Sequence, residues 1–380
     1  MIDAAPAPPA MPGPPRREAP IADVRVSSYR IPTDRPEADG TYSWNGTTLV
    51  IVEASAGGVT GLGYTYGDKS IVALINDLLV ATIKHYDAHD PPAAWRAMTV
   101  AVRNLGRDGL AATAISALDT ALWDLKAKLL NQPLATLFGR YRNDVPIYGS
   151  GGFTTYSDHE LADQLARWVN VEGCASVKMK VGTHPDQDGH RVKIAKAAID
   201  DRALFVDANG AFAAKQALCF AERFAAEGDV RWFEEPVSSD DLGGLAQIRQ
   251  RTPAEMDIAA GEYGYDLDYF RNMLASGAVD VQQADVTRCG GYTGFLQVAA
   301  LCEAYHIPLS GHCAPSLHLP VACAAPRLRH LEWFHDHVRI EHMLFDGAPR
   351  PHGGRIRPDL SRPGHGLEFK FKDAEQFRTA

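Results

Sequence analysis

Short apolar runs alternate with longer amphipathic stretches over most of the chain after Asp144. Each run has the length of a buried strand and ends in polar or charged residues, and the stretch that follows has apolar residues at helical spacing. The runs cover residues 145–148, 176–180, 204–207, 230–234, 256–262, 279–285, 307–312 and 330–333. Eight such runs in strand-helix alternation predict a (β/α)8-type barrel.

The chain before Asp144 has a different pattern. Two strand-like runs, 24–31 and 47–53, flank a segment rich in turn residues, 33–46, which predicts a hairpin with a long, mobile loop. Apolar residues recur at helical spacing over 111–130, and Pro133 ends that pattern. This part of the chain is therefore predicted to be an α+β domain.

Three successive runs of the predicted barrel end in a carboxylate: Asp207, Glu234 and Glu262, spaced by 27 and 28 residues. Because strands of such a barrel converge at their carboxyl ends, three anionic side chains there would repel one another unless a cation neutralised them. Hard oxygen ligands favour Mg²⁺ over zinc. The alternative is that each carboxylate separately caps a helix or forms an ion pair.

The preceding run ends in Lys178 and Lys180, which strand alternation places on one face. Repulsion and desolvation are expected to lower the pKa of one amine until it can act as a base, although surface lysines are the alternative. Two later runs end in Asp285 and His312, whose side chains could form a hydrogen-bonded acid/base pair. The last run contains Glu332, expected to donate a hydrogen bond to a developing oxyanion if burial raises its pKa.

These motifs together resemble the enolase superfamily, mandelate racemase subgroup. The resemblance rests on KMK, DAN, EEP and GE with Asp285, His312 and Glu332, and on the segment ALDTALWDLKAK. The resemblance extends from about residue 22 over nearly the whole chain. Enzymes of this superfamily use Mg²⁺ together with a Lys or His base. The resemblance implies a (β/α)7β TIM-like barrel over 145–342 and an α+β capping domain over 21–144, completed by the C-terminal segment 343–380.

The resemblance also implies a role for each motif residue. Asp207, Glu234 and Glu262 would bind Mg²⁺, Lys180 would be one base, and Lys178 would hold the substrate carboxylate. His312 with Asp285 would form the second acid/base, Glu332 would hydrogen-bond the carboxylate, and Asn209 would bind substrate. The hairpin loop would fold over the barrel mouth and offer Arg35, Tyr42 and Trp44 to a polyhydroxylated ligand, unless it is only a solvated loop.

The favoured activity is dehydration of a sugar acid to a 2-keto-3-deoxy acid, because acid-sugar dehydratases are numerous in this subgroup. The alternatives are a racemase or epimerase of a 2-hydroxy acid and, less favoured, a non-catalytic carboxylate-binding barrel. Arg288 stands where cycloisomerases of the muconate type would have a second lysine, which argues against cycloisomerisation. His335 and His337 form the HxH pair of amidohydrolases, but they follow the last strand rather than the first.

Composition narrows the function further. The net charge of −9 argues against a grip on nucleic acid, and no apolar run approaches the roughly 20 residues that span a bilayer. The Pro- and Ala-rich residues 1–20 lack the core of a signal peptide and are predicted to be a disordered tail. Six cysteines without a CxxC pair are expected to be buried, reduced thiols of a cytoplasmic protein. The resemblance implies a homo-oligomer.

Overall fold

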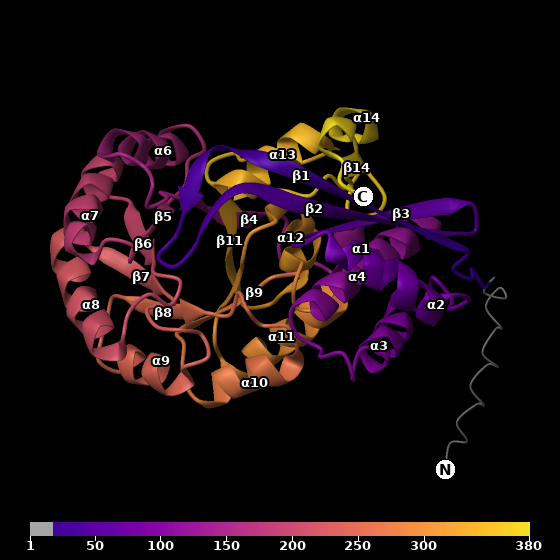
Figure 1. Ribbon diagram of the computed structural model, residues 1–380, viewed down its shortest axis with the longest axis horizontal. Helices are drawn as coiled ribbons and strands as arrows, with labels where there is room; N and C mark the ends of the chain where they lie inside the picture. The colour runs from indigo at the N-terminus through magenta and orange to yellow at the C-terminus, as the bar shows by residue number, and fades with distance from the viewer. Residues whose placement is uncertain (1–17) are drawn as a thin grey trace, which may run out of the picture.

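The computed structural model describes residues 18–380 and contains a closed parallel barrel (Figure 1). Its eight strands follow one another in chain order, and the last pairs with the first. They are β4 (Val145–Gly151), β5 (Ser176–Lys180), β6 (Ala203–Asp207), β7 (Val230–Glu234), β8 (Asp257–Ala260), β9 (Val281–Ala284), β10 (Leu309–Gly311) and β11 (Leu328–Phe334). Each predicted run overlaps one strand, so the predicted barrel is confirmed.

Seven helices connect these strands and form the outer ring in Figure 1. They are α6 (Asp158–Asn170), α7 (Pro185–Ile199), α8 (Ala214–Gly228), α9 (Leu242–Arg249), α10 (Leu267–Ala275), α11 (Gly291–Tyr305) and α12 (Pro315–Ala324), and α13 (His335–Leu344) follows β11. Inside the barrel, Tyr148, Phe205 and Trp232 form an aromatic layer, with the rings of Phe205 and Trp232 stacked 5.2 Å apart. Because side chains alternate along a strand, the residues two positions later on β6 and β7 also point inward.

The predicted α+β cap is a three-stranded antiparallel sheet packed on helices. Its elements are β1 (Asp23–Ala38), β2 (Ser43–Ala56), β3 (Val59–Tyr66), α1 (Ser70–Leu74), a π-helical turn (Ile75–Leu79), α2 (Val80–Ile83), α3 (Pro91–Ala101), α4 (Leu110–Leu129) and α5 (Leu134–Phe138). The long helix α4 joins the cap to the barrel, because Asp119 accepts hydrogen bonds from the backbone N–H and hydroxyl of Thr293 in α11 at 2.9 and 2.6 Å.

The predicted long, mobile loop at 33–46 is wrong. β1 continues to Ala38 and β2 begins at Ser43, so only four residues, 39–42, connect the two strands. The tip is attached to the barrel: the backbone N–H of Thr154 donates to the carbonyl of Ala38 at 2.9 Å, and the Thr183 hydroxyl donates to the carbonyl of Asp39 at 2.5 Å. The hairpin therefore extends from the cap over the barrel, as Figure 1 shows.

The C-terminal segment contacts both parts of the chain. Its elements are β12 (Phe345–Asp346), β13 (Arg355–Ile356), β14 (Glu368–Phe369), α14 (Phe371–Ala374) and a 3₁₀ turn (Glu375–Phe377). β13 pairs with barrel strand β4, whereas the ring of Phe369 lies 5.1 Å from that of Tyr29 in β1. The predicted boundary between residues 342 and 343 falls inside α13, and the predicted division into domains stays a proposal.

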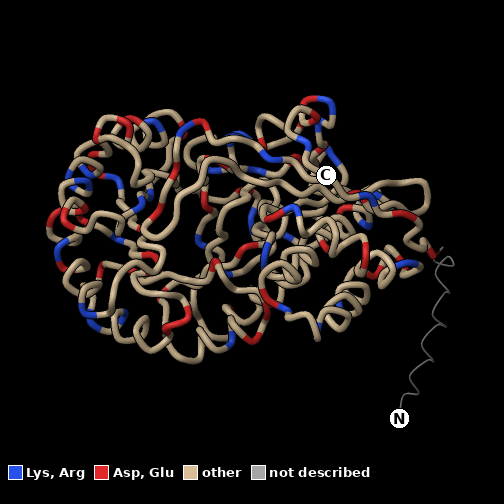
Figure 2. The backbone as a smooth tube through the Cα atoms, viewed as in Figure 1, with Lys and Arg blue, Asp and Glu red and all other residues tan. Residues whose placement is uncertain are grey.

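The structure also tests the predictions for the N-terminal tail, the cysteines and the membrane. The predicted disordered tail, 1–20, lies outside the described residues except for 18–20, where Ala19 is buried and Pro20 bridges to Asp87. Cys219 is exposed, so the prediction of buried thiols is wrong for this residue; the other five are buried and all six are free. Among the described residues, no helix combines the length and apolar character of a membrane span. Figure 2 shows Lys and Arg interspersed with Asp and Glu along the outer helices.

Candidate active site

Three carboxylates converge at the carboxyl end of the barrel. Asp207 and Glu234 are paired residues at the ends of β6 and β7, and Glu262 lies two positions beyond β8. All three are buried, and one oxygen from each lies within 4.8 Å of the others. The buried Oε2 of Glu262 has no hydrogen-bond partner. A buried donor set of three carboxylates with one oxygen unpartnered fits a hard divalent cation such as Mg²⁺.

Two lysines of β5 reach into this group. The Lys178 ammonium is fully buried and lies 2.5 Å from Glu234 Oε1, 2.9 Å from Glu332 Oε1 and 3.3 Å from Asp207 Oδ2. The Lys180 ammonium lies 2.5 Å from Asp207 Oδ2 and 3.0 Å from Asn209 Oδ1. The structure therefore brings the predicted lysines, carboxylates and Asn209 together.

Ion pairs raise the pKa of both lysines in this structure, and the fall expected for one amine beside a metal ion stays a prediction. Burial acts to lower the pKa of Lys178, but the charges of Glu234 and Glu332 outweigh it and raise the pKa. Burial likewise acts to lower the pKa of Lys180, and the charge of Asp207 raises it. The amines form direct ion pairs with carboxylates, so the attraction exceeds the cost of desolvation.

His312 and Asp285 form the predicted pair just beyond β10 and β9. His312 Nδ1 lies 2.8 Å from Asp285 Oδ2, and the other oxygen of Asp285 accepts hydrogen bonds from the backbone N–H and hydroxyl of Thr287, both at 2.7 Å. His312 Nε2 is left facing the centre, 3.4 Å from Glu262 Oε2. Burial acts to lower the pKa of His312, but the charges of Glu262 and Glu332 raise it overall.

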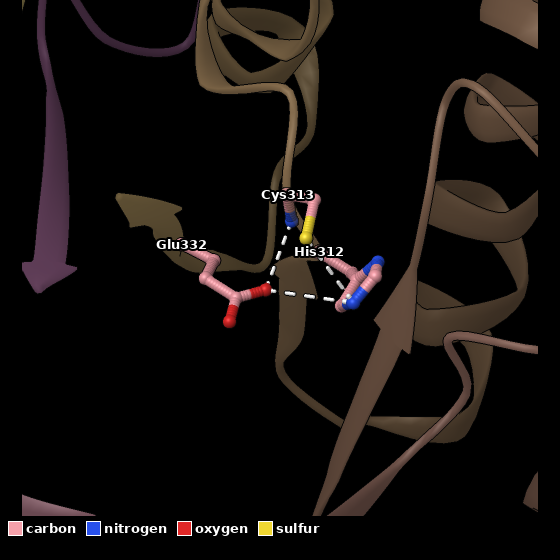
Figure 3. Close-up of side chains that lie close together, drawn as sticks. All are labelled: His312, Cys313 and Glu332. Carbon is pink, nitrogen blue, oxygen red and sulfur yellow. Dashed lines mark hydrogen bonds and ion pairs between the residues drawn. The ribbon is translucent and has the colours of Figure 1, made fainter. Parts of the chain in front are cut away.

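Glu332 is held beside His312 by neighbours that the sequence did not reveal (Figure 3). It accepts hydrogen bonds from the Ser150 hydroxyl at 2.6 Å and from the backbone N–H of Cys313 at 2.9 Å, and the Cys313 sulfur lies 3.3 Å from His312 Nε2. The expectation of a protonated, donating Glu332 is wrong: burial acts to raise its pKa, but Lys178 and His312 lower it well below the usual range.

Ser150 and Cys313 were missed for different reasons. The first predicted strand stopped at residue 148, whereas β4 continues to Gly151, so the end of that strand was never considered. The rule that barrel chemistry lies at strand ends would have found Ser150 with the correct boundary. The sequence pattern predicts a packed thiol at Cys313, and only its position directly after His312 signals a place in the site.

The carboxylates at the mouth outnumber the cations that neutralise them. Burial and the charge of Asp207 raise the pKa of Glu234 to about 8. Burial and Glu262 raise the pKa of Glu235 well above its ordinary value, and its buried Oε1 has no hydrogen-bond partner. Arg288 is the third cation, 3.4 Å from Glu262 and 3.6 Å from Asp285. The site therefore favours a further positive charge.

The hairpin residues predicted to contact substrate behave differently from one another. Trp44 packs against the cluster of Phe153, Tyr156, Cys313 and Phe334 and so reaches the site. Tyr42 is 70% exposed, and its ring lies 6.3 Å from that of Trp44. The guanidinium of Arg35 forms an ion pair with Glu160 on α6 and is not brought into the cluster.

A cavity of about 670 Å³ is lined by Asn209, Glu235 and Tyr263, which lie one or two residues after the three converging carboxylates, although those carboxylates do not line it. Its other lining groups are acidic, hydroxyl, amide or backbone groups: Asp108, Gly210, Ser238, Ser239, Asp240, Tyr265, Asp266, Asp268, Tyr269 and Asn272. Tyr263 also stacks on the Arg288 guanidinium, 5.5 Å from the ring centre. A lining of this chemistry suits a ligand rich in hydroxyl groups.

The HxH pair does not form a common site. His335 Nε2 lies 3.1 Å from Asp34 Oδ2, whereas His337 Nδ1 accepts a hydrogen bond from the backbone N–H of Ala314 and stacks on Tyr66. The two imidazoles thus serve different neighbours, unlike the paired metal ligands of an amidohydrolase.

Comparison with known proteins identifies the family of this chain. Residues 21–139 match the mandelate racemase/muconate lactonizing enzyme N-terminal domain, and residues 160–374 match the enolase C-terminal domain-like family. The 3,6-anhydro-alpha-L-galactonate cycloisomerase of Streptomyces coelicolor is 33% identical, covering 93% of this chain and 98% of that protein. The L-talarate/galactarate dehydratase of Salmonella typhimurium is 31% identical, covering 86% of this chain and 81% of that protein.

Solved structures show the same fold. A mandelate racemase/muconate lactonizing enzyme-like protein from Rubrobacter xylanophilus superposes with a TM-score of 0.93 and 49% identity, covering 95% of this chain and 100% of that one. A racemase from Streptomyces coelicolor with bound magnesium has a TM-score of 0.88 and 32% identity, covering 94% and 100%. The L-talarate dehydratase from Polaromonas, complexed with Mg and L-glucarate, has a TM-score of 0.85 and 28% identity, covering 96% and 98%.

Proposed function

Since the chain belongs to the mandelate racemase/muconate lactonizing enzyme family of the enolase superfamily, we propose that it removes the proton from the carbon next to a sugar-acid carboxylate, with Mg²⁺ as cofactor. The observation that carries the proposal is the arrangement of Lys180 and the His312–Asp285 pair. Lys180 ends β5, whereas Asp285 and His312 directly follow β9 and β10, and the strands of the three converging carboxylates, β6, β7 and β8, lie between them along one arc of the barrel. This arrangement suits a substrate held between two proton-transfer groups.

Asp207, Glu234 and Glu262 would hold the metal ion, and their unpartnered oxygen and shared burial support this assignment. Bound Mg²⁺ neutralises carboxylate oxygens and so lowers the cost of a second negative charge on the substrate. Lys178 would add a fixed positive charge beside the substrate carboxylate, and Glu332 would hold Lys178 in place through the 2.9 Å ion pair.

Lys180 would act as the base on one face of the substrate. In the ion pair with Asp207 its amine is protonated, so it can accept a proton only when Asp207 is engaged elsewhere. Burial then favours the neutral amine, because desolvation disfavours the ammonium form. His312 would act on the other face through Nε2, while Asp285 fixes the tautomer at Nδ1.

Dehydration is the outcome that we favour. Loss of the α-proton to Lys180 gives an enediolate, which expels the oxygen on the β-carbon while His312 protonates it. When that oxygen is a hydroxyl, water leaves and the enol product becomes a 2-keto-3-deoxy acid. The polar cavity beside Asn209 and Tyr263 and the dehydratase names of several relatives support a polyhydroxylated substrate.

Cycloisomerisation is the second candidate, although Arg288 argued against its muconate type. The observation that favours it is the 33% identity, over 93% of this chain, to a cycloisomerase of a 3,6-anhydro sugar acid. The same elimination from a substrate whose β-oxygen belongs to a ring opens that ring and releases no water. A racemase or epimerase would instead return a proton to the same carbon, and a binding barrel would leave the carbon untouched.

Substrate contacts outside the barrel also belong to this proposal. Trp44 and Asn209 are the best-placed candidates, since Trp44 packs against the cluster that contains Cys313 and Asn209 accepts a hydrogen bond from Lys180. Tyr42 would cover the ligand from the exposed hairpin tip, and Arg35 would first have to leave Glu160.

A cytoplasmic location and a homo-oligomeric assembly stay predictions.

The test is a screen of aldonic, uronic, aldaric and anhydro sugar acids with Mg²⁺ in D₂O. Mass spectrometry would follow loss of water, and NMR would follow keto-acid formation and deuterium at the α-carbon. A keto acid with loss of water supports dehydration, and a keto acid without it supports ring opening. Deuterium alone supports racemisation or epimerisation, whereas no signal from any acid would contradict the proposal.

A further inference from the structure

Besides the barrel carboxylates and the group of His312, Cys313 and Glu332, a third cluster of metal-binding residue types lies between the cap hairpin and the helix after the last barrel strand. Asp34 and Glu37 belong to β1, and His335 is the first residue of α13. One potential ligand atom from each lies within 4.8 Å of the others. None of the three belongs to the carboxylate group proposed to hold Mg²⁺.

An irregularity in the hairpin brings the two acidic residues to this position. Pro32 pairs with Gly46 and Glu37 with Trp44, so residues 33–36 of β1 face Asn45 alone. Such extra residues bend a strand and redirect its side chains. As a result, Asp34 lies with both carboxylate oxygens near His335 Nε2, at 3.1 and 3.2 Å.

The buried carboxylate of Glu37 is an independent indication that a cation binds here. Its side chain is fully buried, Oε2 accepts a hydrogen bond from Trp44 Nε1 at 2.6 Å, and the buried Oε1 has no hydrogen-bond partner. Burial and the charge of Asp336 raise the pKa of Glu37 to about 8. A buried carboxylate oxygen without a partner is unfavourable unless a proton or a cation satisfies it.

The positive side chains nearby are engaged elsewhere. The Arg35 guanidinium pairs with Glu160, and the Arg339 guanidinium lies 2.5 Å from Asp336. Over residues 18–380, no Lys or Arg forms an ion pair with Asp34 or Glu37. Two carboxylates and one imidazole therefore face one another without a fixed cation between them.

We propose that Asp34, Glu37 and His335 bind a divalent cation of the zinc type, separately from the Mg²⁺ of the barrel. Imidazole nitrogen with carboxylate oxygen is a ligand set that suits Zn²⁺ better than Mg²⁺, which prefers oxygen and water. A cation here would join β1 to α13. Because Glu37 also holds Trp44, the ion would stabilise the hairpin in its position over the barrel mouth. This proposal does not depend on the reaction proposed above.

The test uses Zn²⁺ as the probe and the whole protein saturated with Mg²⁺, so that the barrel site is occupied. Equilibrium dialysis with metal analysis should find one bound Zn²⁺ per chain. His335→Ala and Glu37→Gln, on different elements, should each weaken Zn²⁺ binding at least about tenfold, since changes to residues that only hydrogen-bond the metal ligands already cost that much. Asp207→Asn, which alters the barrel site, should retain the Zn²⁺.

His190→Ala is the matched control, because His190 Nε2 lies 2.7 Å from Asp158 in an exposed pair that has no third ligand. It should leave Zn²⁺ binding unchanged. The proposal is overturned if the Mg²⁺-saturated protein binds no Zn²⁺, if Asp207→Asn abolishes binding, or if neither cluster variant differs from the control. Retained Mg²⁺ binding in each cluster variant shows that it is folded.

Discussion

Replacing Lys178 by Met tests whether the carboxylates at the barrel mouth are charged in the folded protein. The ammonium of Lys178 is fully buried and lies within 3.3 Å of Asp207, Glu234 and Glu332. Methionine keeps a similar length but removes the charge, so Asp207 and Glu332 lose their charged partner, and Glu234, whose pKa is raised to about 8, loses a hydrogen-bond donor. Breaking a buried ion pair by removing one partner costs about 3–5 kcal/mol.

Magnesium should recover part of this loss. A ligand that binds only the folded state stabilises it by about 2.7 kcal/mol at 100 times its dissociation constant. The variant also lacks an ammonium group that competes with the metal for Glu234 and Asp207. We therefore expect Lys178→Met to gain more stability from Mg²⁺ than the unaltered protein does.

Urea unfolding followed by circular dichroism, with EDTA and then with saturating Mg²⁺, measures both effects. Lys193→Met is the matched control, because Lys193 pairs with Glu227 at 3.4 Å on the exposed surface of α7 and α8. The control should show no measurable loss. If Lys178→Met in EDTA is as stable as the control, the carboxylates are not held as charged partners of Lys178, and the electrostatic reasoning fails.

Three further predictions concern single side chains. His312→Asn should lower turnover of an identified substrate about 10²–10⁴-fold. Deuterium exchange at the α-carbon should persist, because Lys180 is the base proposed for that step. Loss of both activities would contradict the proposal that Lys180 and His312 act separately. Burial and the charge of Asp207 raise the pKa of Glu234 from 4.5 to about 8, so we expect the metal-free protein to hold a proton there, Mg²⁺ affinity to rise with pH across that range, and binding near neutral pH to release a proton. Calorimetry in buffers of different ionisation enthalpy measures the release, and a heat independent of buffer would refute it. Burial raises the pKa of Glu341 from 4.5 to about 7. The protonated carboxyl therefore contributes its full stabilisation below pH 4.5, and the free energy of unfolding falls by about 3 kcal/mol as the pH rises from 4.5 to 7. The free energy of unfolding of Glu341→Gln should lack this decline, and equal pH profiles would show that burial does not perturb the carboxyl.

Local periodicity is sufficient to predict the barrel and most of the charged side chains that gather at its mouth. Strand-helix alternation gives each strand end a defined place at one mouth, so Asp207, Glu234 and Glu262 could be grouped from spacing alone. The same rule identified Lys180 and His312. It failed at Ser150, where one misplaced strand boundary hid the residue, because boundaries depend on pairing with neighbouring strands.

Tertiary structure alone decided what depends on distances between segments far apart in the chain. The pKa of Lys180 is raised and that of Glu332 is lowered, because ion pairs with Asp207 and Lys178 outweigh burial. The hairpin is a pair of extended strands because barrel loops anchor its tip. The cluster of Asp34 with His335 joins residues 301 positions apart. Coulombic and hydrogen-bond energies depend on the distance between groups in space. The spacing of residues in the sequence determines that distance only within one strand or helix.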